Sequence, residues 1–549
     1  MSTTQIDGSL FAKLVKGGAA SLCRSKQIVN DLNVFPIPDG DTGDNMFMTI
    51  DAGAKAVSED EKNLSDVSRT VAQGMLLGAR GNSGVILSRI FSGISKGFEG
   101  KKCAGADDLA KAFRRGIEES YNAVSTPVEG TILTVYRDGV EYAASRVDSG
   151  STLESFFDDF IPELRRSLER TPDLLQVLQD AGVVDSGGAG FVCIAEGMAN
   201  VLHGDIQSYE SASQQSEQKL NFDAFDENTV LEYGYCTEFL LRLQNAKTDI
   251  AAFDMDAFTA WLNSAGDSVV AFRDGSIVKV HVHTMHPGDI LNHCQMYGEY
   301  LKVKIENMTL QHNETTARPE SFSHKPKKRK AYGLVAVANG DGIKGLFSDL
   351  GCDAVVDGGQ SMNPSAEDII RALDKAYAET IFVFPNNSNI IMAAQQAASI
   401  YKDANVIVIP TKTIGEGYAA ISMLDTSSGD TEAITAEMSE VIASVKTGMV
   451  SRAVRDTKKD GIDIKAGDYI GFSDKKIHTS CATSYDAALS LCEALDASHY
   501  DILMLVCGED ARREDSANLY SELSRRYKNT EVILIDGYQP IYDYILILE

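Results

Sequence analysis

Apolar residues recur every three to four positions over most of the first two hundred residues, which is the spacing of one face of an α-helix. Strand-like alternation is almost absent before residue 230. This pattern predicts an all-helical first domain over residues 1–205. The expected helices cover residues 8–32, 46–57, 64–77, 84–98, 106–124 and 153–180.

A second domain is predicted by a change of pattern after this helical region. Residues 204–220 are rich in Ser and Gln and offer little to bury, so they predict a linker. Residues 233–243 and 276–284 then alternate between apolar and polar types, which is typical of strands. We therefore expect an α+β middle domain over residues 221–320.

From residue 329 to residue 549, strand and helix patterns alternate, which predicts a parallel sheet with helical crossovers. Further strands near residues 501–506 and 531–535 predict a second lobe. The expected fold class is therefore multidomain, with an all-α domain, an α+β domain and a two-lobed α/β domain. Polar loops that can bind a ligand, or simply cap helices, follow the predicted strands at residues 358–365, 385–389 and 410–413.

A stiff acidic turn is the first candidate for chemistry. Asp39 and Asp41 flank Gly40, and Pro36 and Pro38 restrict the approach to the turn. Paired carboxylates in such a loop suit a hydrated Mg²⁺ ion that grips nucleotide phosphates. The same residue types are also typical of an exposed turn.

Two glycine-rich segments, residues 78–84 and 185–191, run directly into apolar stretches and look like helix starts. Glycines let backbone N–H groups approach an anion, and a helix N-terminus adds its positive dipole end. The first segment lacks the Gly-Lys-Ser/Thr ending of a Walker A loop. Each segment alone is also consistent with a helix cap and close helix packing.

A candidate metal site lies on the predicted strands of the middle domain. His281 and His283 are two positions apart and so share one face of a strand, and Cys236 lies on the other predicted strand. If the two strands are neighbours, these side chains form a set that suits Zn²⁺, with His286 and Cys294 as possible additional ligands. The alternative is a polar strand face with Cys236 as a small core residue.

Four of these segments resemble the nucleotide-binding subunit of dihydroxyacetone kinases, and the whole chain resembles the bacterial fatty acid kinase catalytic subunit. The segments are residues 33–45, 78–84, 129–134 and 185–190. The resemblance implies a helical kinase domain, a middle domain and a DegV-like C-terminal domain. It also implies ATP and Mg²⁺ as cofactors, a DegV-like fatty-acid-binding partner, and an acyl phosphate product that serves phospholipid synthesis.

The resemblance carries individual roles to this chain. Asp39 and Asp41 would hold Mg²⁺, and Cys236, His281 and His283 would form the metal triad of the middle domain. The nucleotide would contact Thr42, Asn45, Gly81, Asn82, Ser83, Gly84, Thr131, Asp185 and Gly187. Dihydroxyacetone kinases carry a third metal-binding Asp where this chain has Val34, which leaves open whether Asn33 or Asp44 completes the shell and whether one or two Mg²⁺ ions bind.

The formal net charge of −28 argues against a nucleic-acid partner and against adsorption to anionic membranes. No apolar run reaches membrane-spanning length, so no stable membrane insertion is expected. The cysteines are dispersed and residues 1–10 lack the features of a secretory signal, so a cytoplasmic location is expected. A homodimer is a further expectation, with its interface left open.

The expected reaction transfers the γ-phosphoryl group of ATP to the carboxylate of a fatty acid that a separate protein presents. A carboxylate is already a nucleophile at neutral pH, so positioning and charge neutralisation can carry the reaction. Arg80 is the candidate positive group, although it can instead anchor a helix end. Two alternatives are a dihydroxyacetone-type kinase of small molecules and a non-catalytic nucleotide-binding scaffold.

Overall fold

The computed structural model describes residues 3–33, 40–124, 126–204, 235–250, 253–274, 276–307, 329–359, 362–426 and 429–549. Asp39 lies outside these ranges, as do the side chains of Cys236, His281 and His283 within their strands. The chain divides into two compact units, Met1–Ser216 with Lys328–Glu549, and Glu217–Lys327. The first unit therefore contains both the helical domain and the C-terminal domain.

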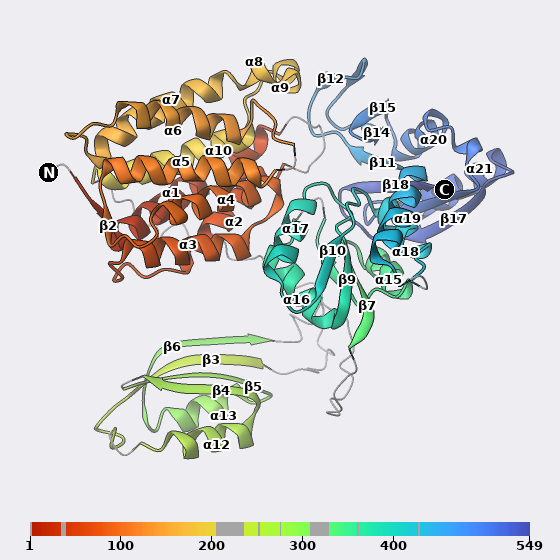
Figure 1. The fold of residues 1–549 in the computed structure, drawn as a ribbon. Helices are drawn as coiled ribbons and strands as arrows, with labels where there is room; N and C mark the ends of the chain where they lie inside the picture. The colour runs from red at the N-terminus through yellow and green to blue at the C-terminus, as the bar shows by residue number, and fades with distance from the viewer. Residues whose placement is uncertain are drawn as a thin grey trace. The chain divides into compact units, whose positions relative to one another are not determined.

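The N-terminal domain is helical, as predicted (Figure 1). Its long helices are α1 (Gly8–Asp31), α2 (Thr42–Lys55), α3 (Leu64–Gly78), α4 (Gly81–Gly97), α5 (Ala106–Asn122), α6 (Ile132–Arg146), α7 (Leu153–Glu169) and α10 (Ser186–Leu202). The helices α8 (Thr171–Leu174) and α9 (Gln176–Ala181) are short, and β1 (Ile6–Asp7) pairs with β2 (Cys103–Ala104). Edge-to-face contacts of Phe113 with Phe156, Phe157 and Phe160 build part of the core.

Several helix boundaries differ from the predicted ones. The helix expected over residues 153–180 ends at Glu169, and a new short helix begins with Pro172 in its first turn, where proline is well tolerated. Helix α6 was not predicted. Helices α2 and α4 begin at Thr42 and Gly81, earlier than expected, so the candidate binding residues belong to their first turns.

Helices α1 and α10 cross at very close range. A Cβ atom added to Gly197 would lie 2.3 Å from the carbonyl oxygen of Gly17 and 2.6 Å from Cβ of Ser21. Such a distance is below any normal contact, so the crossing requires glycine at this point. The two helices thereby bring the N-terminus of α10 to the same end of the domain as the C-terminus of α1.

The middle domain is a four-stranded antiparallel sheet in the order β4-β5-β3-β6. Its elements are β3 (Tyr235–Leu243), α12 (Met255–Ala265), β4 (Asp267–Asp274), β5 (Ile277–Thr284), α13 (Pro287–Cys294) and β6 (Gly298–Asn307). Both helices lie on one face of the sheet in Figure 1, where Phe239, Val280 and Val282 are buried in the core with Phe258 and Leu262. The predicted strands β3 and β5 are direct neighbours.

The C-terminal domain has two main sheets and a small two-stranded one, in agreement with the predicted two-lobed α/β fold. The first sheet is parallel in the order β10-β9-β7-β8, and the second is mixed in the order β15-β14-β11-β18-β16-β17. The first lobe contains β7 (Lys330–Ala338), α15 (Asp341–Asp349), β8 (Ala354–Asp357), α16 (Ala366–Ala376), β9 (Ala378–Phe384), α17 (Ile391–Ile400) and β10 (Asn405–Val408).

The second sheet follows α18 (Ile414–Ser422) and α19 (Thr431–Ser444). Its elements are β11 (Lys446–Arg452), β14 (Tyr469–Ser473), β15 (Lys476–Cys481), α20 (Ser484–Ala494), β16 (Ile502–Cys507), α21 (Arg513–Arg526), β17 (Glu531–Asp536) and β18 (Tyr542–Leu548), with the small hairpin β12 (Thr457–Lys459) and β13 (Ile462–Ile464). The core of the first lobe continues into the helical domain, because Ala79 and Val85 are buried in the same cluster as Val335 and Ile369.

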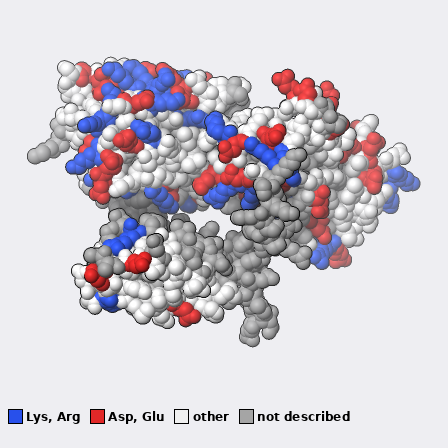
Figure 2. All heavy atoms as spheres, turned by 60° about the horizontal axis from the view of Figure 1, so that its bottom comes forward, with Lys and Arg blue, Asp and Glu red and all other residues white. Residues whose placement is uncertain are grey.

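Acidic and basic side chains are interspersed over the face of the helical domain that lies at the upper left of Figure 2. Ion pairs such as Lys111–Asp107 (2.6 Å) and Arg114–Glu141 (3.0 Å) belong to this domain. The large negative charge therefore does not form one continuous acidic field on that face. Among the described residues, no helix is both long and apolar enough to cross a bilayer.

We expect the substitution Gly197→Ala to destabilise the helical domain by about 1–3 kcal/mol, because the added methyl group overpacks the crossing of α1 and α10. Urea unfolding followed by circular dichroism measures this change. The matched control is Gly345→Ala in α15, where an added Cβ meets nothing within 4 Å. Alanine is the better helix former, so the control should be neutral or stabilising by up to about 1 kcal/mol. Equal effects of the two substitutions would contradict the role of the close crossing.

Candidate functional site

The N-termini of four helices, α2, α4, α6 and α10, meet at one end of the helical domain. The Ser186 hydroxyl donates to Oγ1 of Thr42 at 3.3 Å, which joins the starts of α10 and α2. The Asp185 carboxylate accepts from the backbone N–H of Ile132, which joins α10 to the start of α6. Helix N-termini carry partial positive charge and free N–H groups, so four of them together suit a polyanion.

The start of α2 is fixed by Asn30 of α1. The Asn30 side-chain oxygen accepts from the backbone N–H of Gly43 at 2.7 Å, and its amide nitrogen donates to Oδ2 of Asp44 at 2.7 Å. Lys26 pairs with the other oxygen of Asp44 at 2.8 Å. A Cβ on Gly43 would lie 2.2 Å from the carbonyl oxygen of Lys26, so the two helices touch through their backbones here. Both carboxylate oxygens of Asp44 thus join α2 to α1.

The glycine loop packs against the first turns of α2. Gly81 has a φ of +57°, and a Cβ there would lie 2.7 Å from Nδ2 of Asn45. The Arg80 backbone N–H donates to Oγ1 of Thr49 at 3.3 Å, and that hydroxyl donates to the carbonyl of Asn45 at 2.7 Å. The residues before α2 and α4 provide no side-chain cap for either helix. Arg80 therefore leaves the first N–H groups of α4 uncapped, whereas at the start of α2 the N–H groups of Gly43 and Asp44 donate to Asn30.

The turn before α6 is held by internal hydrogen bonds. Gly130 has a φ of +84° and donates its N–H to Oγ1 of Thr134 at 2.8 Å. The Thr134 hydroxyl in turn donates to Glu129 at 2.7 Å, and Glu129 forms an ion pair with Arg137 at 2.9 Å. Thr131 directs its hydroxyl to the carbonyl of Val128 at 2.8 Å. The turn therefore presents Thr131 at the start of α6 in a fixed position.

Asp185 caps α10 and carries a perturbed carboxyl group. Its Oδ2 atom accepts from the backbone N–H of Gly188 at 2.7 Å. Burial raises the pKa of Asp185 to about 6, because the low-dielectric surroundings disfavour the charged form. A Cβ on the neighbouring Gly187 would lie 3.3 Å from Cβ of Ile132, so the α10 start lies close against α6.

Arg80 points from the glycine loop to the C-terminal domain. Its Nη1 atom donates to the backbone carbonyl of Asn363 at 2.7 Å, and its guanidinium lies 3.5 Å from Oδ2 of Asp368. The side-chain amide of Asn363 donates to Oδ2 of Asp41. Asn363 thereby connects the acidic turn with the glycine loop.

The structure brings together most of the residues predicted for nucleotide binding. Thr42, Asn45, Gly81 and Gly84 form one contiguous group, because a Cβ on Gly84 would lie 3.2 Å from the carbonyl of Asn45. Asn82 and Ser83 lie in the first turn of α4, and Thr131, Asp185 and Gly187 lie at the starts of α6 and α10. Sequence reasoning missed Asn30 and Asn363. The second of these belongs to the loop 358–365, in which Ser365 caps α16 as predicted for such loops.

The donor set at this end of the domain fits a divalent cation with bound waters. The side-chain oxygens of Asn82 and Asn363 are buried and have no hydrogen-bond partner among the described residues. Oxygen atoms of amides and carboxylates are the ligands that Mg²⁺ and its waters prefer. Asp41 contributes a carboxylate beside Asn363. Within the described ranges, no group of three His, Cys, Asp or Glu side chains could hold a metal ion, so a cation here would also need amide oxygens or water.

In the middle domain the register pairs Cys236 with His283 and Glu238 with His281. The prediction that these strands are neighbours is confirmed, while the side chains of the proposed triad lie outside the described residues. Cys294 is fully buried in the apolar core, and burial raises the pKa of its thiol to about 12. Cys294 packs in the same apolar cluster as Phe239 and Val280, which is the environment of a core residue.

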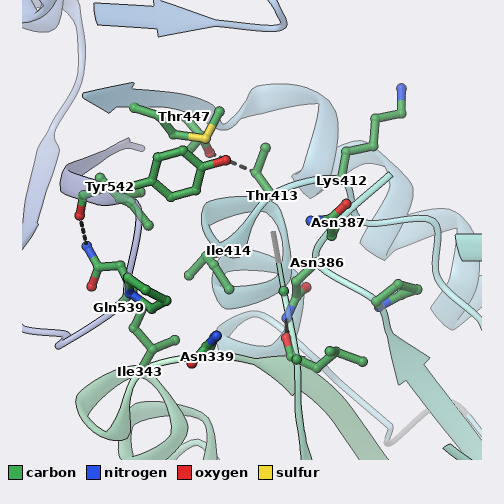
Figure 3. Close-up of a pocket in the computed structure, with 17 residues that line it drawn as sticks. Asn339, Ile343, Asn386, Asn387, Lys412, Thr413, Ile414, Thr447, Gln539 and Tyr542 are labelled. Atoms are coloured by element: carbon green, nitrogen blue, oxygen red, sulfur yellow. Dashed lines mark hydrogen bonds between the residues drawn. The ribbon is translucent and has the colours of Figure 1, made fainter. Parts of the chain in front are cut away.

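A cavity of about 70 Å³ lies between the two lobes of the C-terminal domain (Figure 3). It lies at the switch point of the first sheet, where β7 connects to β8 on one side and β9 connects to β10 on the other. Ligands usually bind at such a point in α/β sheets. The predicted loops 385–389 and 410–413 contribute to its wall. The lining includes Asn339, Asn386, Lys412, Thr413, Thr447 and Tyr542.

The fold consists of a helical domain joined to a middle domain and a two-lobed α/β domain. Residues 36–200 match the DAK2 domain, which is a domain of kinases. Residues 232–315 match the FakA-like middle domain of fatty acid kinases, and residues 333–549 match the FakA-like C-terminal domain. The chain belongs to the family of fatty acid kinase catalytic subunits.

Relatives of the same length support this assignment. The chain is 40% identical to the protein YloV of Bacillus subtilis over 558 residues, which cover 100% of both chains. It is 38% identical to an uncharacterized protein of Staphylococcus aureus over 553 residues, again with 100% of both chains covered.

Solved structures resemble parts of the chain more distantly. A fatty-acid-binding DegV family protein from Thermus thermophilus is 13% identical with a TM-score of 0.31, covering 40% of this chain and 99% of its own. The dihydroxyacetone kinase of C. freundii in complex with AMP-PNP and Mg²⁺ is 20% identical with a TM-score of 0.26, covering 35% of this chain and 33% of its own.

We expect Asp185→Asn to remove a pH-dependent cost to stability. Because the folded pKa is raised to about 6, the folded chain holds this proton more tightly than the unfolded chain, and stability falls as pH rises from about 4 to 6. Asparagine retains a cap oxygen without the charge. The variant should therefore melt at a higher temperature than the unmodified protein at pH 7.5, and the difference should vanish near pH 4.

Thermal melts of the nucleotide-free protein between pH 4 and pH 8 measure this difference. Asp107→Asn, at an exposed position of α5, controls for the loss of one surface charge. A difference in melting temperature that stays constant across this range would show that the Asp185 carboxyl does not titrate as described.

Proposed function

We propose that this chain transfers the γ-phosphoryl group of ATP to the carboxylate of a fatty acid held by a separate lipid-binding protein, giving an acyl phosphate. The observation that carries this proposal is the meeting of four helix N-termini beside Asp41 and the glycine loop. Such an arrangement suits a nucleotide triphosphate, whose charge is spread along a chain of phosphates. Membership of a kinase family supports the same assignment.

Each part of the site has a separate proposed task. The N–H groups at the start of α4, with Thr42, Asn45 and the residues 81–84, hold the phosphates. Asp39 and Asp41 hold Mg²⁺, which supplies charge neutralisation on the phosphates. Thr131, Asp185 and Gly187 bound the nucleotide pocket. Arg80 adds positive charge next to Asn363 and fixes the loop that contacts Asp41.

The acceptor carboxylate requires no strong general base. It is ionised at neutral pH and is already nucleophilic, so the protein must chiefly align it with the γ-phosphate and exclude water. This explains a site made of helix ends, amides and carboxylates rather than of a histidine and a nucleophile.

The interlobe cavity does not by itself enclose a long acyl chain. Its volume of about 70 Å³ is well below the roughly 300–1,000 Å³ of pockets that enclose ligands of comparable size to a long acyl chain. We propose that a DegV-like fatty-acid-binding protein presents the lipid and docks on the C-terminal domain. We also propose that the chain forms a homodimer. A Zn²⁺ ion held by Cys236, His281 and His283 would stabilise the middle domain.

We expect the full chain to form acyl phosphate from ATP, Mg²⁺ and an oleate-loaded DegV-like partner, and Asp41→Ala to reduce the rate by at least about 100-fold through lost metal positioning. The exposed Asp107→Ala is the matched control and should retain the rate. Product is measured by phosphate transfer from radiolabelled ATP to oleate.

Two results would contradict this proposal, and each would indicate a different function. Transfer of phosphate to dihydroxyacetone in place of oleate would identify a small-molecule kinase. Tight nucleotide binding without turnover on any acceptor would identify a non-catalytic scaffold.

A further inference from the structure

Asn363 of the C-terminal domain lies inside the site formed by the helical domain. It is only 1% exposed, and it precedes α16 in the loop that follows β8. Its amide nitrogen donates to Oδ2 of Asp41, and it lies 3.4 Å from the position of a Cβ on Gly81. One side chain therefore touches both the acidic turn and the glycine loop, although 322 residues separate it from Asp41.

The surrounding contacts hold this asparagine in place. Arg80 donates to the Asn363 carbonyl at 2.7 Å and pairs with Asp368 in the first turn of α16. The Ala366 backbone N–H donates to the carbonyl of Ala79 at 3.3 Å. Gln396 of α17, which is 2% exposed, donates to the carbonyl of Leu76 at the end of α3. The loop is thus part of a packed interface.

The side-chain oxygen of Asn363 gives independent support for a bound ligand. It is buried and has no hydrogen-bond partner within the described part of the chain, and the same is true of the oxygen of Asn82 in the glycine loop. Leaving a buried oxygen without a hydrogen-bond partner is unfavourable. Reversing the amide would place its oxygen against the Asp41 carboxylate, so the contact with Asp41 fixes the orientation.

We propose that Asn363 is a positioning residue of the kinase site, supplied by the C-terminal domain. Its N–H group orients the Asp41 carboxylate, and its free amide oxygen accepts a hydrogen bond from a water of the Mg²⁺ nucleotide. The complete site is then shared between two domains of the chain. This inference rests on the nucleotide site of the proposed function and is independent of which acceptor receives the phosphate.

The test measures binding of a fluorescent ADP analogue to the full chain over a range of Mg²⁺ concentrations. Outer-shell partners of metal ligands typically contribute 10–100-fold to metal affinity, so Asn363→Ala should raise the Mg²⁺ concentration for half-maximal binding by about tenfold. Saturating Mg²⁺ should restore binding. Asn518→Ala, an exposed asparagine on α21, is the matched control and should behave as the unmodified protein.

Gln396→Ala is a second control, which weakens the interface between the two domains without removing the contact with Asp41. It removes the contact with Leu76 and should lower the melting temperature without changing the Mg²⁺ requirement. An equal increase in the Mg²⁺ requirement for Gln396→Ala and Asn363→Ala would show that domain packing alone causes the effect, and would overturn the specific role of Asn363.

Asn363→Asp provides a nearly isosteric second variant. It replaces the donor to Asp41 with a carboxylate, and two adjacent carboxylates repel unless a cation lies near them. Its melting temperature should therefore rise more on addition of Mg²⁺ than that of the unmodified protein. An unchanged Mg²⁺ response in both Asn363 variants would overturn the proposal.

These assays contain neither fatty acid nor partner. If the unmodified protein forms no acyl phosphate but the Asn363 variants show the altered Mg²⁺ response, only the proposed acceptor fails. If acyl phosphate forms and both variants keep the ordinary Mg²⁺ response, only the role of Asn363 fails.

Discussion

Direct contact between helix backbones is the constraint on which the candidate site depends. At the crossing of α1 and α10 and at the start of α2, a single added Cβ atom would lie 2.2–2.3 Å from a backbone carbonyl oxygen. These contacts bring the positive ends of several helices together, which is unfavourable for the helices alone. The carboxylate of Asp41, the residue before α2, offsets part of this charge, and the phosphates of a nucleotide can offset more. The same packing that makes the domain compact thus prepares it for a polyanion.

The C-terminal domain uses equivalent loops of one sheet for two purposes. The loops that follow β9 and β10 line the cavity between its lobes. The loop that follows β8 contributes Gly358 and Gly359 to the same lining and also extends through Asn363 to the helical domain. The C-terminal domain thereby also supports the candidate nucleotide site of the helical domain.

Periodicity predicted those elements whose signals are local. Helices α1, α3 and α5 and strands β3, β5 and β16 begin and end within a few residues of the predicted positions. The resemblance of the motifs supplied the residues that gather at the helix starts. It could not supply the partners of Arg80 or the position of Asn363, because these contacts join residues about 280–320 positions apart and depend on how two domains pack. Asn30 was missed for a similar reason, since its role is to hold α2 rather than to extend the pattern of α1.

The charge of the chain also bears on the form in which an anionic acceptor arrives. A net charge of −28 repels a free fatty acid carboxylate and an anionic membrane surface, although salt limits this repulsion to about 8 Å in physiological conditions. Within that distance, the positive potential of the helix N-termini attracts the acceptor carboxylate. This attraction acts only close to the bound phosphates. A carrier that encloses the acyl chain removes the need for a large apolar pocket in this chain and brings the carboxylate past the repulsive outer surface. Under the proposed function, the acidic surface, the small interlobe cavity and the helix-end site are consistent with a division of labour in which one protein binds the lipid and the other performs the phosphoryl transfer.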